Sequence, residues 1–170
     1  HCKVVQSGQG ADELFAGYHW YPQVDGHSDA FTAYRMAFFD RDHGELLDTL
    51  QRKWQGEDWA GEFVREHFAM HGAAAPVDKA LRLDTTVMLV DDPVKRVDNM
   101  TMAWGLEART PFLDYRLVEL AARIPPRFKL GDGGKQVLKE AARRVIPHAV
   151  IDRPKGYFPV PGRKHLQGAT

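Results

Sequence analysis

A nine-residue stretch, SGQGADELF at residues 7–15, constrains the fold of this 170-residue chain more than any other feature. It follows the apolar run Val4-Val5 and leads into residues that favour a helix, so the sequence predicts a strand, a glycine loop and a helix in succession. The glycines let a backbone approach a ligand closely, and the first turn of a helix attracts anions. The arrangement is typical of a phosphate-binding site. A glycine turn followed by acidic residues that suit the helix dipole has the same pattern.

Two carboxylates follow the loop directly, at Asp12 and Glu13. Unassisted, they would repel a phosphate group. Mg²⁺ is bound by carboxylate and phosphate oxygens together, so the pair predicts a divalent cation between the protein and the phosphate.

Composition excludes several other functions. The 23 basic and 23 acidic side chains cancel, which argues against nucleic acid or a membrane surface as a partner. No apolar run approaches the roughly 20 residues of a membrane span. A single cysteine excludes an internal disulfide and fits a reducing compartment, so we expect a cytoplasmic protein.

Beyond the opening strand, the apolar spacing predicts mostly helices. We expect a first helix over residues 11–19 and its end near Pro22 and Gly26. Later helices are expected with these signals: Ser28 as a cap, apolar residues at 46–50 and 59–68, Asp78 as a cap, Asp92-Pro93 as a new start that buries Trp104, Asp114 as a cap, and Gly133-Gly134 before the last helix. The sequence therefore predicts a helical domain with one convincing strand.

Three further segments carry motifs. Residues 96–114 read RVDNMTMAWGLEARTPFLD, and the end of the chain carries KQVLKEA at 135–141 and IDRPKGYF at 151–158. Together with residues 7–15, these segments resemble, in the same order, the signatures of the asparagine synthase family. The resemblance extends over nearly the whole chain and is specific to the synthetase half of such enzymes.

The resemblance implies an α/β nucleotide-binding fold of the adenine nucleotide alpha-hydrolase (HUP-like) class. Residues 1–170 would form its mostly helical C-terminal portion, with one or two strands. The family also has an N-terminal glutaminase domain and an upstream S-G-G-x-D-S loop that grips the pyrophosphate of ATP. Neither occurs in these 170 residues, so we expect this chain to be part of a longer protein.

The resemblance also implies a reaction and its participants. ATP, with Mg²⁺, activates a carboxylate acceptor as an acyl-adenylate, and ammonia derived from glutamine then forms an amide. The matching residues are Ser7, Gly8 and Gly10 for ATP, Asp12 for the metal, and Lys155 as the catalytic cation during adenylation. Each also has a purely structural interpretation as a turn residue, a helix-dipole carboxylate or a solvated surface lysine.

Four residues are expected to bind the acceptor: Gln9, Asp98, Glu107 and Arg109. Gln9 stands where asparagine synthetases carry glutamate, which favours an acceptor other than free aspartate. Asp98 could instead form a salt-bridged helix face with Arg96. Glu107 and Arg109 could equally be an ion pair that holds a loop.

The segments 7–13, 17–22 and 154–161 look together most like a subgroup that amidates an acylated glutamine dipeptide, the N-acetylglutaminylglutamine amidotransferases. Two alternatives stay open: an asparagine synthetase acting on aspartate, and a non-catalytic scaffold of the same fold. The segment GDGGK at 131–135 lacks the spacing of a P-loop, so we interpret it as a turn, with Lys135 a weaker phosphate candidate.

Overall fold

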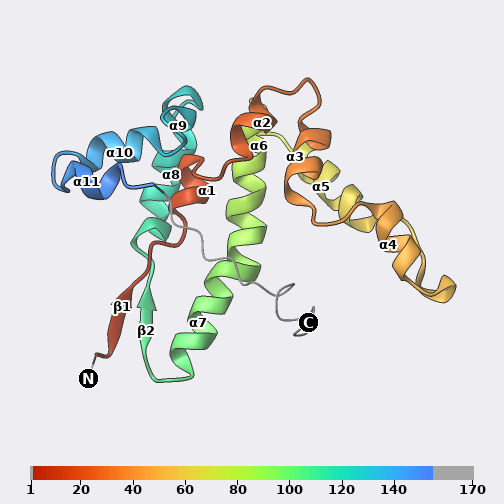
Figure 1. The fold of residues 1–170 in the computed structure, drawn as a ribbon, viewed down its shortest axis with the longest axis horizontal. Coiled ribbons are helices and arrows are strands. Elements are labelled where there is room, and N and C mark those ends of the chain that lie inside the picture. The colour runs from red at the N-terminus through yellow and green to blue at the C-terminus, as the bar shows by residue number, and fades with distance from the viewer. Residues whose placement is uncertain (1, 155–170) are drawn as a thin grey trace, which may run out of the picture. The chain divides into compact units, whose positions relative to one another are not determined.

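The computed structural model describes residues 2–154, and these are mostly helical (Figure 1). They fall into two compact units, the first ending at Leu138 and the second starting at Lys139. The elements of the first unit are β1 (Val4–Gln6), α1 (Ala11–Phe15), α2 (Tyr21–Asp25), α3 (Ala30–Phe38), α4 (His43–Thr49), η1 (Arg52–Trp54), α5 (Trp59–Ala69), α6 (Pro76–Leu83), η2 (Asp84–Met88), η3 (Val90–Val94), α7 (Lys95–Met102), β2 (Glu107–Arg109), η4 (Pro111–Leu113), α8 (Tyr115–Arg123) and α9 (Arg127–Leu130).

The two strands form a parallel pair, with Val4 opposite Glu107 and Gln6 opposite Arg109. β1 was predicted from its apolar run. The position of β2 was not, because three residues with charged ends carry no strand periodicity. Both strands lie on the surface of the described chain, and Val4 and Val5 are about 40 % exposed.

α1 is shorter than predicted. It ends at Phe15 because Ala16 takes a left-handed conformation, with φ 55°. Contrary to the prediction, Pro22 does not end this unit, because it lies in the first turn of α2, where a missing N–H costs nothing. Gly26, predicted with it as an end, is the C-cap of α2. The N-cap of α3 is Asp29 and not Ser28, with the Asp29 side chain accepting a hydrogen bond from the N–H of Phe31.

The expected new helix at Asp92-Pro93 does not exist as such. Pro93 lies inside a continuous helical segment that runs from α6 through the π-helical turns η2 and η3 into α7, the long green helix of Figure 1. A π turn inserts an extra residue into an α-helix. Here the π turn η3 contains Pro93, which has no N–H to donate to the helix. Trp104, predicted to be buried, is 89 % exposed just beyond this segment.

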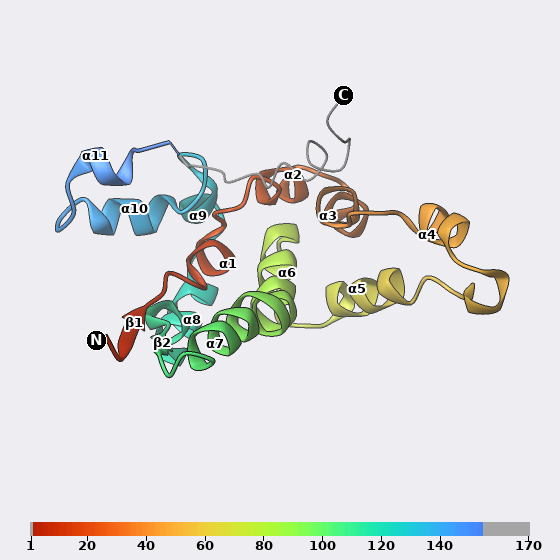
Figure 2. The same ribbon diagram turned by 60° about the horizontal axis from the view of Figure 1, so that its bottom comes forward.

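The main core of the first unit lies where α2, α3 and α5 surround the N-terminal end of α6, as the two views in Figures 1 and 2 show. It contains Tyr21, Tyr34, Val64, Phe68, Val77, Ala80, Leu81 and Leu83. A smaller core joins α1 to α8 through Leu14, Phe15 and Ala121. The prediction that Asp114 caps a helix is confirmed, because its side chain accepts the N–H of Arg116 at the start of α8.

The boundary between the units falls within α10 (Gln136–Ala142), and α11 (His148–Ile151) follows in the second. There, Arg143 pairs with both carboxylate oxygens of Asp152, at 2.9 and 2.8 Å. In the part of the chain that the structure describes, no helix is both long and apolar enough to cross a bilayer.

Candidate functional site

The predicted glycine loop lies at the carboxyl ends of both strands. The N–H of Ser7 donates to the carbonyl oxygen of Arg109 at 2.8 Å, which continues the β1–β2 ladder by one residue into the loop. In open α/β sheets, ligands bind at this edge. The site residues Ser7 and Arg109, 102 positions apart in sequence, are therefore brought together through their backbones.

Gly10 is required by the geometry of the loop. It has φ 94°, which L side chains rarely adopt, and a Cβ at this position would overlap the side chain of Leu113. Gly10 is buried, whereas Gly8 is exposed with open space around it. Gly8 is therefore the glycine whose backbone a ligand can approach, and Gly10 is the one that packs the loop against η4.

The two carboxylates after the loop point in different directions. Glu13 is buried and accepts a hydrogen bond from the hydroxyl of Tyr18 at 2.7 Å. Burial, followed by this bond to Glu13, raises the pKa of Tyr18 far above its ordinary value, so the phenol stays a donor. Only Asp12 keeps part of its side chain accessible, at 23 %. Of the predicted carboxylate pair, Asp12 alone is placed to meet a ligand at the loop.

Asp12 pairs with Lys135, whose ammonium nitrogen lies 3.0 Å from its Oδ1. The N–H of Lys135 also donates to the carbonyl oxygen of Phe15 at 2.9 Å, at the end of α1. Gly17 lies directly beneath the pair, where a Cβ would overlap the Asp12 carboxylate. Lys135 was a secondary candidate in the sequence. Its signals were its position after a glycine-rich turn and at the start of the motif KQVLKEA.

The other predicted substrate residues are less closely grouped. Glu107 and Arg109 form an ion pair at 3.0 Å on the exposed surface of β2, beside the loop. Gln9 is half-buried in the loop itself. Asp98 lies on the exposed side of α7, which packs against β2. Lys155, the predicted catalytic cation, lies outside the described residues.

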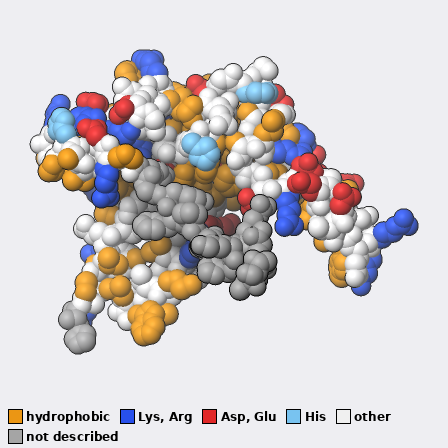
Figure 3. Space-filling view, viewed as in Figure 1, with side chains coloured by type: hydrophobic (Ala, Val, Ile, Leu, Met, Phe, Trp, Pro, Cys, Tyr) orange, Lys and Arg blue, Asp and Glu red, His pale blue; other side chains and the backbone are white. Residues whose placement is uncertain are grey.

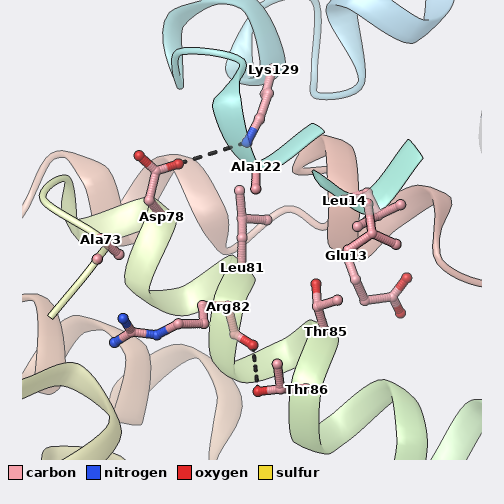
Figure 4. Close-up of a pocket in the computed structure, with 12 residues that line it drawn as sticks. Glu13, Leu14, Ala73, Asp78, Leu81, Arg82, Thr85, Thr86, Ala122 and Lys129 are labelled. Atoms are coloured by element: carbon pink, nitrogen blue, oxygen red, sulfur yellow. Dashed lines mark hydrogen bonds and ion pairs between the residues drawn. The ribbon is translucent and has the colours of Figure 1, made fainter. Parts of the chain in front are cut away.

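A cavity of about 210 Å³ lies on the inner side of α1, lined by residues of α1, α6, η2, α8 and α9 (Figure 4). Lys129 lines the cavity and is almost completely buried. Its ammonium nitrogen lies 3.7 Å from Oδ1 of Asp78. Burial lowers the pKa of Lys129 and raises the pKa of Asp78, so desolvation outweighs the attraction of the pair on both sides. Sequence patterns gave no sign of this cavity.

The carboxylate of Asp12 suits Mg²⁺ that is also bound by phosphate oxygens. Among residues 2–154 there is no group of three or more His, Cys, Asp and Glu side chains that could hold a metal. Where phosphates are present, however, Mg²⁺ takes only one or two carboxylates from the protein and completes its shell with phosphate oxygens and water. Asp12 is suited to be one such carboxylate.

Comparison with known proteins identifies the family of this chain. The sequence profile of the asparagine synthase family matches residues 1–170, and the chain belongs to that family. It is similar to the glutamine-hydrolysing asparagine synthetases 1 and 3 of Bacillus subtilis, with 27 % identity over 98 % of this chain and 31 % over 92 %. It is 33 % identical to the human glutamine-hydrolysing asparagine synthetase over 57 % of the chain.

The chain spans 32 % and 26 % of the lengths of the two Bacillus proteins, and its match covers 18 % of the human one. No solved structure matches the chain.

Proposed function

We propose that this chain is the C-terminal portion of a synthetase domain that forms an amide at the expense of ATP. The observation that carries the proposal is the loop at the strand ends, where Asp12 and Lys135 set a carboxylate and an ammonium 3.0 Å apart beside an accessible glycine backbone. A site for a metal-bound triphosphate needs both charges, one for the metal and one for the phosphate oxygens.

In the proposed reaction, an oxygen of the acceptor carboxylate attacks the α-phosphorus of ATP. The bond from that phosphorus to the bridging oxygen breaks and pyrophosphate leaves. Ammonia then attacks the acyl carbon, a proton is lost to solvent, and AMP departs with the carboxylate oxygen. Mg²⁺, when bound, neutralises phosphate charge and orients the leaving group.

The residues of this chain have distinct roles in the proposal. The backbone of Ser7 and Gly8 positions the nucleotide at the carboxyl end of β1, while Asp12 provides a metal ligand. Lys155 would neutralise the charge that develops as pyrophosphate leaves. Since lysine carries a compact charge on a flexible stem, it suits a group that changes position during the reaction.

The exposed strands support the proposed place of this chain in a larger domain. Parallel sheets are normally covered on both faces, yet β1 and β2 form a lone pair within the described residues, with Val4 and Val5 partly exposed. Figure 3 shows apolar side chains gathered at the end that carries β1, β2 and α7, and Met100, Met102 and Trp104 are more than half exposed there. We propose that further strands of the complete, cytoplasmic protein pack here, with a glutaminase domain supplying ammonia.

The acceptor is the least constrained part of the proposal. The relatives are named for asparagine synthesis, whereas Gln9 is neutral and can both donate and accept hydrogen bonds, which favours an amide-bearing acceptor. We propose an acylated glutamine dipeptide, with aspartate as the competing acceptor.

The decisive experiment measures pyrophosphate release by the complete protein with ATP, Mg²⁺ and each acceptor in turn. Release should require all three components and should be faster with the dipeptide than with aspartate. Lys155→Ala should abolish release and leave nucleotide binding largely intact. Normal release by that variant would refute the role of Lys155. ATP binding without release, with any acceptor, would favour a non-catalytic scaffold, and faster release with aspartate would reject the dipeptide.

A further inference from the structure

The segment that presents Lys135 has an unusual backbone. Four consecutive residues, from Asp132 to Lys135, have positive φ values of 54°, 69°, 91° and 58°. Two of them are not glycine, and left-handed conformations are costly for L residues with a side chain. Such conformations persist where the surroundings fix them, and they concentrate at functional sites.

Contacts with the end of α1 fix this turn in place. The N–H of Lys135 donates to Phe15, and a Cβ at Gly134 would overlap the carbonyl oxygen of Ala16. The backbone of Lys135 is therefore held against the same short helix that carries Asp12. Its ammonium reaches the Asp12 carboxylate from a position 123 residues away in sequence.

The ammonium of Lys135 consequently occupies a position that a cation bound to Asp12 would need. A divalent cation arriving alone would have to displace the ammonium and then remain close to it, and like charges at this separation repel. Phosphate oxygens change this balance, because they are attracted to the metal and to the displaced ammonium together. The side chains of Lys135 and Asp12 are each about a quarter exposed, so solvent screens these attractions and repulsions only in part.

We propose that Lys135 is a positioning residue that makes cation binding at Asp12 conditional on the nucleotide. The inference rests on the proposed function and deepens it. Without phosphates, the ammonium holds the Asp12 carboxylate and keeps a divalent cation out. With phosphates present, the metal takes the carboxylate. The site is then loaded by the metal–nucleotide complex and not by free metal, which would otherwise be bound without a substrate.

The test is a binding titration with Mn²⁺, followed by electron paramagnetic resonance, on the complete protein. It is performed with Mn²⁺ alone and again with a saturating non-hydrolysable ATP analogue. In the wild type, the analogue should tighten Mn²⁺ binding at least a hundredfold. Lys135→Met, which keeps the length of the stem, should bind Mn²⁺ alone about tenfold more tightly. In this variant, the increase in Mn²⁺ affinity that the analogue causes should be smaller than in the wild type by at least the same factor.

Three control variants separate the charge of Lys135 from its packing. Lys135→Arg should behave as the wild type, because it restores the cation on the same backbone. Lys135→Gln should behave as Lys135→Met, and serves if the methionine variant folds poorly. Lys95→Met removes an exposed lysine of α7 and should leave both titrations unchanged. All titrations are repeated with Asp12→Asn, which identifies the part of Mn²⁺ binding that depends on Asp12.

The outcomes distinguish the inference from the proposed function. One outcome is that the wild type and Lys135→Met bind Mn²⁺ equally tightly, gain equally in Mn²⁺ affinity from the analogue, and lose both on Asp12→Asn. This outcome would reject the role of Lys135 and leave the metal site in place. Binding of Mn²⁺ with the analogue that is indifferent to Asp12→Asn would reject the proposed metal site itself, and this inference with it.

Discussion

Two aspartates of the first unit have opposite surroundings. Asp84, at the junction of α6 and η2, is completely buried and accepts hydrogen bonds from the hydroxyls of Tyr21, at 2.6 Å, and Tyr34. Asp12, at the start of α1, is partly exposed and faces the ammonium of Lys135. The partners of Asp84 come from α2 and α3, so its carboxylate joins three segments of the main core.

The difference shows how one type of side chain can stabilise the fold in one place and, as proposed for Asp12, bind a ligand in another. The partners of Asp84 are neutral donors in rigid aromatic side chains, and its site has no access for a second ligand. Lys135, which pairs with Asp12, carries its charge on a flexible stem, and the pair is partly accessible to solvent. Burial and the type of partner, more than the carboxylate itself, separate Asp84, which stabilises the fold, from Asp12, for which a ligand role is proposed.

The largest expected effect is on stability, at Asp84. Asp84→Ala leaves two buried hydroxyls without an acceptor, and each such group costs about 1–3 kcal/mol. Including the cavity, we expect the free energy of unfolding to fall by about 3–4 kcal/mol in chemical denaturation. Asp12→Ala removes a pair that is partly solvated and should cost less than about 1 kcal/mol. Similar losses at the two positions would contradict the comparison.

The next effect is on the pH dependence of stability. Desolvation raises the pKa of Asp84 from 3.8 to about 6, despite the opposing hydrogen bonds from Tyr21 and Tyr34. Between about pH 4 and 6, the folded protein keeps a proton that the unfolded chain has lost, so stability falls as the pH rises through this interval. The change is about 3 kcal/mol for a shift of roughly two units, and it is constant above pH 6.

This contribution is isolated by measuring the wild type and Asp84→Asn in parallel and subtracting the two pH profiles. The subtraction is needed because the pKa of Asp78 is also raised, while the pKa of Asp114 is lowered to about 2 through its hydrogen bonds with Arg116. A difference that does not change between pH 4 and 6 would mean that Asp84 titrates as an exposed carboxyl does.

A smaller effect is expected in the turn that supports Lys135, where two glycines provide a matched pair. Gly133 and Gly134 both have positive φ, but only at Gly134 would a Cβ overlap another residue, at the Ala16 carbonyl oxygen. Gly133→Ala should therefore cost about 1 kcal/mol for the backbone conformation alone. Gly134→Ala should cost about 2 kcal/mol or more, because the turn must also move away from α1. Equal costs in thermal unfolding would show that the turn does not rest on α1.

How far these features could be predicted from the sequence depended on the range of the interaction. β1, the loop at residues 7–10 and the cap at Asp114 were predicted because their signals lie within a few consecutive residues. The continuity of the helix across Pro93 was missed, since it depends on π turns that no local pattern announces. The pairing of Asp12 with Lys135 spans 123 residues and arises only when the turn docks on α1.

The family signatures named candidate site residues but did not predict how they are arranged. Ser7 and Arg109 were both predicted as site residues, but the contact between them is a backbone hydrogen bond, which no side-chain motif specifies. Glu13 was grouped with Asp12 as a phosphate-facing carboxylate. The structure buries it against Tyr18, because consecutive residues of a helix point in different directions.

The smallest expected effect on stability is at the Glu107–Arg109 pair, where the sequence left a structural and a substrate role open. Both side chains are more than half exposed, and exposed pairs contribute less than about 1 kcal/mol. Since the backbone and not the side chain of Arg109 holds Ser7, Arg109→Ala should change the free energy of unfolding by under about 0.5 kcal/mol and leave the KM for ATP unchanged. Its position beside the loop favours contact with the acceptor, whose KM should rise at least fivefold in the pyrophosphate assay. A loss of stability with an unchanged acceptor KM would identify the pair as structural. Arg109 would then, like Asp84, stabilise the fold and not bind a ligand.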